Sequence, residues 1–84
     1  MVLLTIKTKL MDYVDNQWHH RPDSDLYTEH CYINPDKVAF INKCKGVEDT
    51  YQITIECGST QQYIYTNEKG KRLIETWKAT PRIH

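Results

Sequence analysis

Three cysteines and four histidines are the side chains in this sequence best suited to chemistry, since both types bind metals and take part in nucleophilic catalysis. Cys31, Cys44 and Cys57 are too far apart to form a C-x-x-C pair, and an odd number of cysteines favours reduced thiols over a disulfide framework. His30 and Cys31 are adjacent, so on a strand they point to opposite faces. Structural zinc needs four converging nitrogen or sulfur ligands, so we expect neither a metal site nor a cofactor.

Cys57 precedes Gly58 at the end of a predicted strand, which makes it the most accessible thiol. A cysteine nucleophile needs a neighbouring histidine and a third group that orients it, and the sequence shows no such arrangement. A chain of 84 residues also leaves little room for a catalytic cleft. We therefore predict that the protein is not an enzyme.

The segment of residues 13–27 combines aromatic side chains with histidine, arginine and acidic residues, a composition suited to binding. Trp18 lies within it and is expected either to fold back onto the core or to be presented to a partner. The residues predicted to contact a protein partner are Tyr13, Trp18, His19, His20, Arg21 and Tyr27. Exposed sheet edges offer a second docking surface, for another protein or for another copy of the chain as a homo-oligomer. A non-catalytic protein-interaction module is therefore the predicted function.

The alternative is nucleic-acid binding through the basic residues near the end of the chain. These residues are Lys69, Lys71, Arg72, Lys78 and Arg82, with Tyr63 and Tyr65 on a neighbouring predicted strand. Basic groups beside aromatic rings are typical of proteins that bind single strands. However, eleven Lys and Arg balance eleven Asp and Glu, so no net field attracts polyanions or an anionic membrane. Nucleic acid is thus the less favoured partner.

The beginning of the sequence does not have the features of a secretion signal. No basic region precedes its short apolar run, and no small-residue cleavage site follows it. No run approaches the roughly 18 apolar residues that a membrane span requires. We expect a cytoplasmic protein without a membrane partner, which also suits the unpaired thiols.

These candidate residues must be positioned by a small fold that is mainly β. Alternating residues predict strands over 2–10, 26–33, 50–57 and 61–66, and a nearly continuous apolar run predicts a further strand over 37–44. Residues 12–25 are rich in polar and turn-forming types, which predicts a long loop or the tip of a hairpin. The expected fold is one α+β domain, with a small antiparallel sheet of four or five strands and one C-terminal helix.

The predicted helix covers residues 67–78 and packs on the sheet through one apolar stripe. Leu73, Ile74 and Trp77 recur at helical spacing and form this stripe. Gly70 is expected to weaken the first turns, because glycine is a poor helix former. Pro81 ends the helix, so residues 80–84 are predicted to be a frayed tail.

Several turn and core positions form one pattern along the chain. The pattern is a Leu-Thr strand, an Asn-Pro-Asp turn, an Asp-Thr stretch with alternating apolar residues, a glycine turn, a tyrosine-containing strand and a short helix. Its residues are Leu4, Thr5, Asn34, Pro35, Asp36, Val38, Ile41, Asp49, Thr50, Ile53, Ile55, Gly58, Tyr63, Tyr65, Leu73 and Ile74. This pattern resembles that of the FlbD-like small flagellar proteins of bacteria. About twenty residues, from Lys9 to His30, are inserted relative to this pattern. The resemblance implies a similar fold in a small bacterial or bacteriophage protein.

Overall fold

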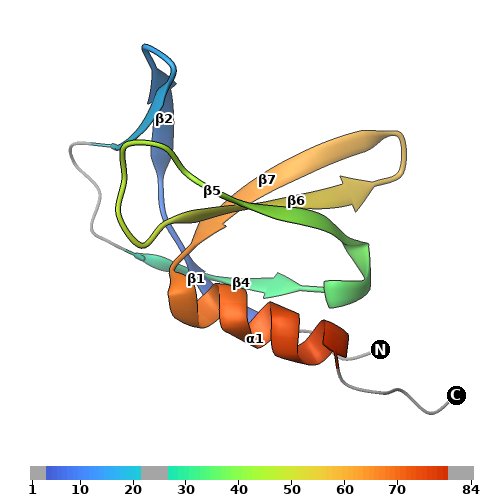
Figure 1. Ribbon diagram of the computed structural model, residues 1–84. Coiled ribbons are helices and arrows are strands. Elements are labelled where there is room, and N and C mark those ends of the chain that lie inside the picture. Colours follow the sequence, from blue (N-terminus) through green and yellow to red (C-terminus); the bar gives the residue numbers. More distant parts are fainter. Residues whose placement is uncertain (1–3, 22–26, 80–84) are drawn as a thin grey trace, which may run out of the picture.

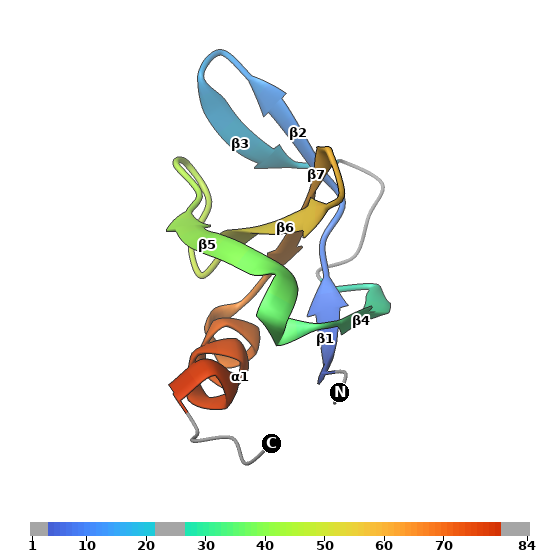
Figure 2. The ribbon, with the colours of Figure 1, turned by 90° about the vertical axis from the view of Figure 1, so that its right-hand side faces the viewer.

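The computed structural model describes residues 4–21 and 27–79. Its elements are β1 (Leu4–Thr8), β2 (Met11–Val14), β3 (Gln17–His20), β4 (Glu29–Ile33), a 3-10 turn (Pro35–Lys37), β5 (Val38–Lys43), β6 (Tyr51–Cys57), β7 (Thr60–Thr66) and α1 (Glu68–Ala79). Figures 1 and 2 show the β5–β6–β7 sheet on one side of the molecule and the β1–β4 pair with α1 on the other. The β2–β3 hairpin projects away from both (Figures 1 and 2).

All strand pairs are antiparallel. β1 pairs with β4, β2 pairs with β3, and β6 lies between β5 and β7. Immediately after β1, the Lys9 N–H donates a hydrogen bond of 3.2 Å to the Tyr65 carbonyl on β7. This bond joins the β1–β4 pair to the edge of the three-stranded sheet.

The core lies where the two larger sheets and the helix meet. Its residues are Ile6, Ile33, Val38, Ile53 and Ile74, each at most 6% exposed. They come from β1, β4, β5, β6 and α1 respectively, so nearly every element outside the β2–β3 hairpin contributes one β-branched side chain. Burying such a side chain contributes about 1.5–3 kcal/mol, which makes this cluster the main source of stability.

The predicted class is confirmed, since the chain is mainly β with one C-terminal helix. The predicted four or five strands are too few, because the structure has seven short strands in three small sheets. Across the described residues, no helix has the length and apolar character needed to cross a membrane.

Of the two alternatives predicted for residues 12–25, a long loop or the tip of a hairpin, the structure shows a hairpin as far as His20, formed by β2 and β3. The two connecting residues, Asp15 and Asn16, have φ of 54° and 63°. Two successive positive φ values give a type I′ turn, which matches the twist of paired strands. Short polar side chains tolerate this conformation, but the glycine that usually marks it is missing. Residues 22–25 of the predicted loop and 80–84 of the predicted tail lie outside the described residues.

The helix begins and ends within one residue of its predicted bounds, but it packs differently. Ile74 is fully buried, whereas Leu73 is 44% exposed and does not join the core. Gly70 is buried, and a Cβ there would overlap Thr66 Oγ1 and lie 2.9 Å from Thr66 Cβ. The glycine therefore allows α1 to lie directly against the end of β7, which is a packing role beyond its effect on helix propensity.

Candidate functional site

The outer face of the β5–β6–β7 sheet carries aromatic side chains. Phe40 lies opposite Thr54 in the strand register, and Thr54 lies opposite Tyr63, so the three share one face. Tyr65 follows Tyr63 by two positions and lies on the same face. Phe40 and Tyr63 are 53% and 52% exposed, whereas Thr54 between them is 1% exposed. The two rings therefore cover the threonine while remaining in contact with solvent.

The β2–β3 hairpin extends this set of aromatic residues. Trp18 on β3 packs on Tyr65, with ring centroids 4.8 Å apart and an interplanar angle of 56°. Tyr13 on β2 packs on Trp18 with a centroid distance of 4.9 Å and an angle of 48°. Tilted rings at this spacing are an arrangement that aromatic pairs prefer. We call the set the aromatic row; it comprises Tyr13, Trp18, Phe40, Tyr63 and Tyr65.

Backbone contacts hold the hairpin against the connection between β5 and β6. The Trp18 N–H donates a 3.0 Å hydrogen bond to the Lys45 carbonyl. Gly46 has φ of 84°, and a Cβ there would lie 3.3 Å from both Gln17 Cβ and the Trp18 carbonyl. Both the positive φ and the close approach favour glycine at this position. The hairpin is thus anchored along β3, while its two-residue turn stays exposed.

The structure divides the six residues predicted to contact a partner. Tyr13, His19 and Arg21 are exposed, and the Arg21 guanidinium lies 3.3 Å from the Asp12 carboxylate. Trp18, His20 and Tyr27 instead contact the body of the domain. Of these three, His20 is nonetheless exposed, so a partner can reach it as well as the first group, whereas Trp18 positions the hairpin on the sheet.

Lys9 is the centre of a polar cluster that the sequence did not predict. This lysine is only 6% exposed, and its Nζ donates a 2.7 Å hydrogen bond to Thr50 Oγ1. The same nitrogen lies 4.5 Å from the centroid of the Tyr27 ring and 3.5 Å from His20 Nε2. The cluster therefore connects the end of β1, the end of β3 and the residue preceding β6. A lysine on the polar face of an alternating strand is normally read as exposed, which is why the pattern gave no signal.

Burial sets the protonation of this cluster. Burial lowers the pKa of Lys9, and electrostatic interactions with Asp49 and then Cys44 oppose this shift. Burial, together with the charge of Lys9, also lowers the pKa of His20. Burial first and Asp49 second raise the pKa of Tyr27 to about 12. Burial also raises the pKa of the Cys44 thiol to about 11, with Lys9 opposing. At neutral pH the tyrosine and the thiol therefore stay protonated, so neither is poised as a nucleophile or a base.

The basic residues of α1 are mostly paired within the chain. Lys71 Nζ lies 3.7 Å and 3.5 Å from the carboxylates of Glu68 and Glu75. Arg72 Nε donates a 3.0 Å hydrogen bond to Glu68, and Lys78 Nζ donates one of 3.1 Å to a backbone carbonyl of β5. Such pairing reduces the charge available to phosphate groups, so the predicted nucleic-acid surface is weaker than the sequence indicated. Arg82 lies outside the described residues.

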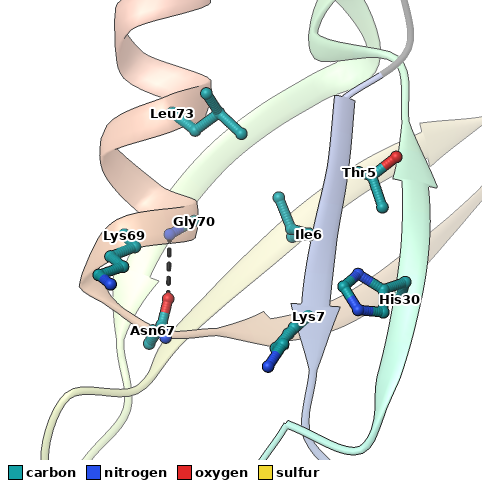
Figure 3. Close-up of a pocket in the computed structure, with 8 residues that line it drawn as sticks. All are labelled: Thr5, Ile6, Lys7, His30, Asn67, Lys69, Gly70 and Leu73. Carbon is teal, nitrogen blue, oxygen red and sulfur yellow. Dashed lines mark hydrogen bonds between the residues drawn. The ribbon is translucent and has the colours of Figure 1, made fainter.

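A groove of about 230 Å³ lies between β1 and the first turns of α1 (Figure 3). We call it the β1–α1 groove; its lining residues are Thr5, Ile6, Lys7, His30, Asn67, Lys69, Gly70 and Leu73. Ile6 and Leu73 point into the space between strand and helix, and Lys7 and Lys69 lie near the start of α1 (Figure 3). Lys69 has no acidic partner within residues 4–21 and 27–79, whereas Lys71 and Arg72 are paired with acidic side chains.

The residues considered as metal ligands are not brought together. Cys31 is half-buried, Cys44 is buried and Cys57 is exposed. In the part of the chain that the structure describes, no group of three His, Cys, Asp or Glu residues could hold a metal ion.

Phe40 was not predicted as a site residue, and Tyr63 and Tyr65 were expected only as companions of the basic helix. Each residue was assigned to a strand from the local pattern. Which face each ring occupies depends on the register of three strands, which short-range alternation does not specify. The Thr-Gln-Thr side of β6 was the available signal, since it marks the outer face on which these rings gather.

Comparisons with protein-family models, curated proteins and solved structures found no match to this chain. Its function is therefore inferred from its own side chains and their arrangement.

Proposed function

We propose that this chain is a non-catalytic protein-interaction module whose docking surface is the aromatic row. The observation that carries the proposal is the exposure of three of its rings, since Tyr13, Phe40 and Tyr63 are 58%, 53% and 52% exposed. Aromatic residues are enriched in protein interfaces and at their energetic centres, because they bury a large area with few rotatable bonds. A partner that covers these rings removes apolar surface from water, which drives association.

The polar side chains around the row favour a protein partner over nucleic acid. The residues that share the outer face with the rings are Asn42, Gln52, Thr54, Glu56 and Gln61. None of them is Lys or Arg, whereas binding to a nucleic-acid backbone depends on such cations. Amide side chains instead exchange hydrogen bonds with peptide groups and form the polar rim of protein interfaces.

The anchored hairpin supplies the outer part of the docking surface. Because Trp18 is seated on Tyr65, the direction of the hairpin is fixed before a partner arrives. Val14, at the end of β2, is 51% exposed beside Tyr13. A surface that is already ordered loses little conformational entropy on binding, which favours affinity. We place the module in the cytoplasm, where the exposed Cys57 thiol stays reduced.

Site-specific photocrosslinking tests this proposal. Benzoylphenylalanine is introduced at Phe40 or at Val14 in the cells that produce the protein, and at Tyr32 as the control. Tyr32 is 74% exposed but lies on β4, outside the aromatic row. We expect adducts with the same protein from Phe40 and Val14 and no such adduct from Tyr32. Equal adducts from all three positions, or none from Phe40 and Val14, would contradict the proposal.

A further inference from the structure

We infer that the β1–α1 groove binds an extended acidic peptide segment, which adds as a strand to the free edge of β1 (Figure 3). The groove is formed by elements other than those of the aromatic row, so this inference does not depend on the function proposed for the row.

Every second residue of β1 directs its backbone N–H and C=O groups towards the groove. β1 pairs with β4 along its whole length. In an antiparallel pair, opposite residues alternate between exchanging two backbone hydrogen bonds and exchanging none. The Lys9 N–H points away from β4, since it donates to the Tyr65 carbonyl on β7. Lys7 and Thr5 precede Lys9 by two and four positions along the extended chain, so their N–H and C=O groups also face away from β4.

Among the residues that the structure describes, no strand covers this part of the edge. The backbone hydrogen bond to β7 is made at Lys9, and the chain of β7 then turns into α1, which forms the far wall of the groove (Figure 3). Within the described ranges, the backbone groups of Thr5 and Lys7 have no hydrogen-bond partner on this side. A free strand edge beside a helix is a structure on which an extended peptide can add, with main-chain hydrogen bonds giving affinity.

The charges of the groove select an acidic ligand. Lys7 from β1, His30 from β4 and Lys69 from α1 line it, and none of the lining residues is acidic. The neighbouring Glu68 carboxylate is already engaged, at 3.0 Å from Arg72. Two lysines and a histidine from three elements therefore present hydrogen-bond donors that have no acidic partner in the described part of the chain. Asp or Glu side chains of a peptide complement them through charge-assisted hydrogen bonds.

The remaining lining adds an apolar preference. Leu73 is an apolar residue that is 44% exposed, and it points into the groove beside Ile6 (Figure 3). Gly70 has no side chain to fill the space between them. The ligand is therefore an extended segment in which at least one aliphatic residue lies between acidic ones.

The edge of β5 is also unpaired within the described sheets, but it carries features that discourage strand addition. Lys37 and Lys43 flank it, and the register shifts between Val38 and Phe40. The Val38 carbonyl already accepts a hydrogen bond from Lys78. The irregular register and the occupied carbonyl discourage pairing at β5, so β1 is the better receptor.

Selection from a displayed library of random heptapeptides tests the inference. The immobilised full chain is the target, and the most enriched peptide is synthesised with a fluorescent label as the probe. We expect enriched sequences in which Asp or Glu alternates with Val, Ile or Leu and which lack a central Pro. No enrichment above the uncoated support, or enrichment of basic sequences, overturns the inference.

Charge reversal then locates the probe. The Lys7→Glu, Lys69→Glu double variant changes exposed side chains, so the fold persists, and it should weaken probe binding by roughly tenfold or more in an anisotropy titration. The matched control is Lys37→Glu, Lys43→Glu, which makes the same charge change at the two ends of β5 and should leave the Kd within about twofold. Unchanged binding by the Lys7, Lys69 variant overturns the inference. A Phe40→Thr variant should bind the probe as the wild type does. The experiments therefore test peptide binding in the groove separately from partner binding by the aromatic row.

Amide hydrogen exchange distinguishes strand addition from attachment by side chains alone. In the free protein the Ile6 and Thr8 amides, bonded to β4, should exchange slowly, and the Thr5 and Lys7 amides should exchange fast. Saturation with the probe should slow exchange at Thr5 and Lys7 by roughly tenfold or more. A bound probe that leaves both amides unprotected overturns strand addition. A concentration-dependent dimer that the Lys7→Glu, Lys69→Glu variant abolishes would identify a second copy as the occupant and overturn the peptide assignment.

Discussion

Trp18→Ala is the substitution that tests most of the site geometry at once, because Trp18 contacts both Tyr13 and Tyr65. Replacing a fully buried Trp by Ala costs about 3–5 kcal/mol, and Trp18 is half-buried, so about half of that loss is expected. Counted instead as two aromatic pairs of about 0.5–1.5 kcal/mol each, the loss is about 1–3 kcal/mol. Both routes give about 2 kcal/mol of unfolding free energy for the anchored hairpin.

Urea unfolding followed by the fluorescence of the remaining Trp77 measures this loss. A decrease of about 2 kcal/mol corresponds to a fall in Tm of about 8–16 °C for a domain of this size. Tyr13→Ala is the matched control, since it removes a single ring pair from an exposed site and should cost about 0.5–1.5 kcal/mol. The claim that Trp18 anchors the hairpin is refuted if Trp18→Ala lowers the unfolding free energy by less than about 0.5 kcal/mol, or by no more than Tyr13→Ala does.

Three further predictions concern the helix contact and the thiols. Gly70→Ala should destabilise the domain by roughly 1–3 kcal/mol, because the new Cβ would overlap Thr66 Oγ1. This loss is expected even though alanine is a better helix former than glycine by about 1 kcal/mol, and a rise in Tm would contradict it. Alkylation at pH 8 should modify the exposed Cys57 first and Cys44 last, since Cys44 is buried and burial raises its pKa to about 11; equal rates in the native protein would count against this packing. The unfolding free energy of the wild type minus that of a Cys44→Ala variant should be constant below pH 9 and should fall between pH 9 and about pH 11. The reason is that the thiol has a pKa of 9.0 in the unfolded chain, so it loses its proton there before it does so in the folded protein. The lowered pKa of Lys9 acts in the opposite sense, which is why the comparison uses a variant that keeps Lys9; a relative stability that rises over this interval would overturn the assignment.

The parts of the fold that local pattern specifies were predictable. β6 and β7 alternate regularly around Gly58, and α1 follows from apolar spacing and a terminating proline, so both were placed within a residue or two. The β2–β3 hairpin was harder, since its turn is Asp15–Asn16 rather than a pair with glycine.

The features that were not predicted, above all the burial of Lys9 and Thr54, depend on contacts between residues distant in the sequence. Lys9 is buried because Tyr27 and Thr50 close over it, and its own strand pattern assigns it to solvent. Thr54 is buried because Phe40 and Tyr63 cover it across two strand pairings. Such burial follows from register and sheet closure, which a single sequence does not encode in any short window.

Capture of the partner by a Phe40→Thr, Tyr63→Thr variant is the most direct test of the aromatic row. Threonine is β-branched and, like the aromatic residues that it replaces, favours strands, so the sheet should persist and the melting curve should confirm it. Tyr32→Thr is the matched control on β4. Protein recovered from a lysate of the producing cells is quantified by mass spectrometry against the wild type. We predict that the double variant loses the partner that photocrosslinking identifies and that the control retains it; a folded double variant that captures as much partner as the wild type would contradict the proposed function.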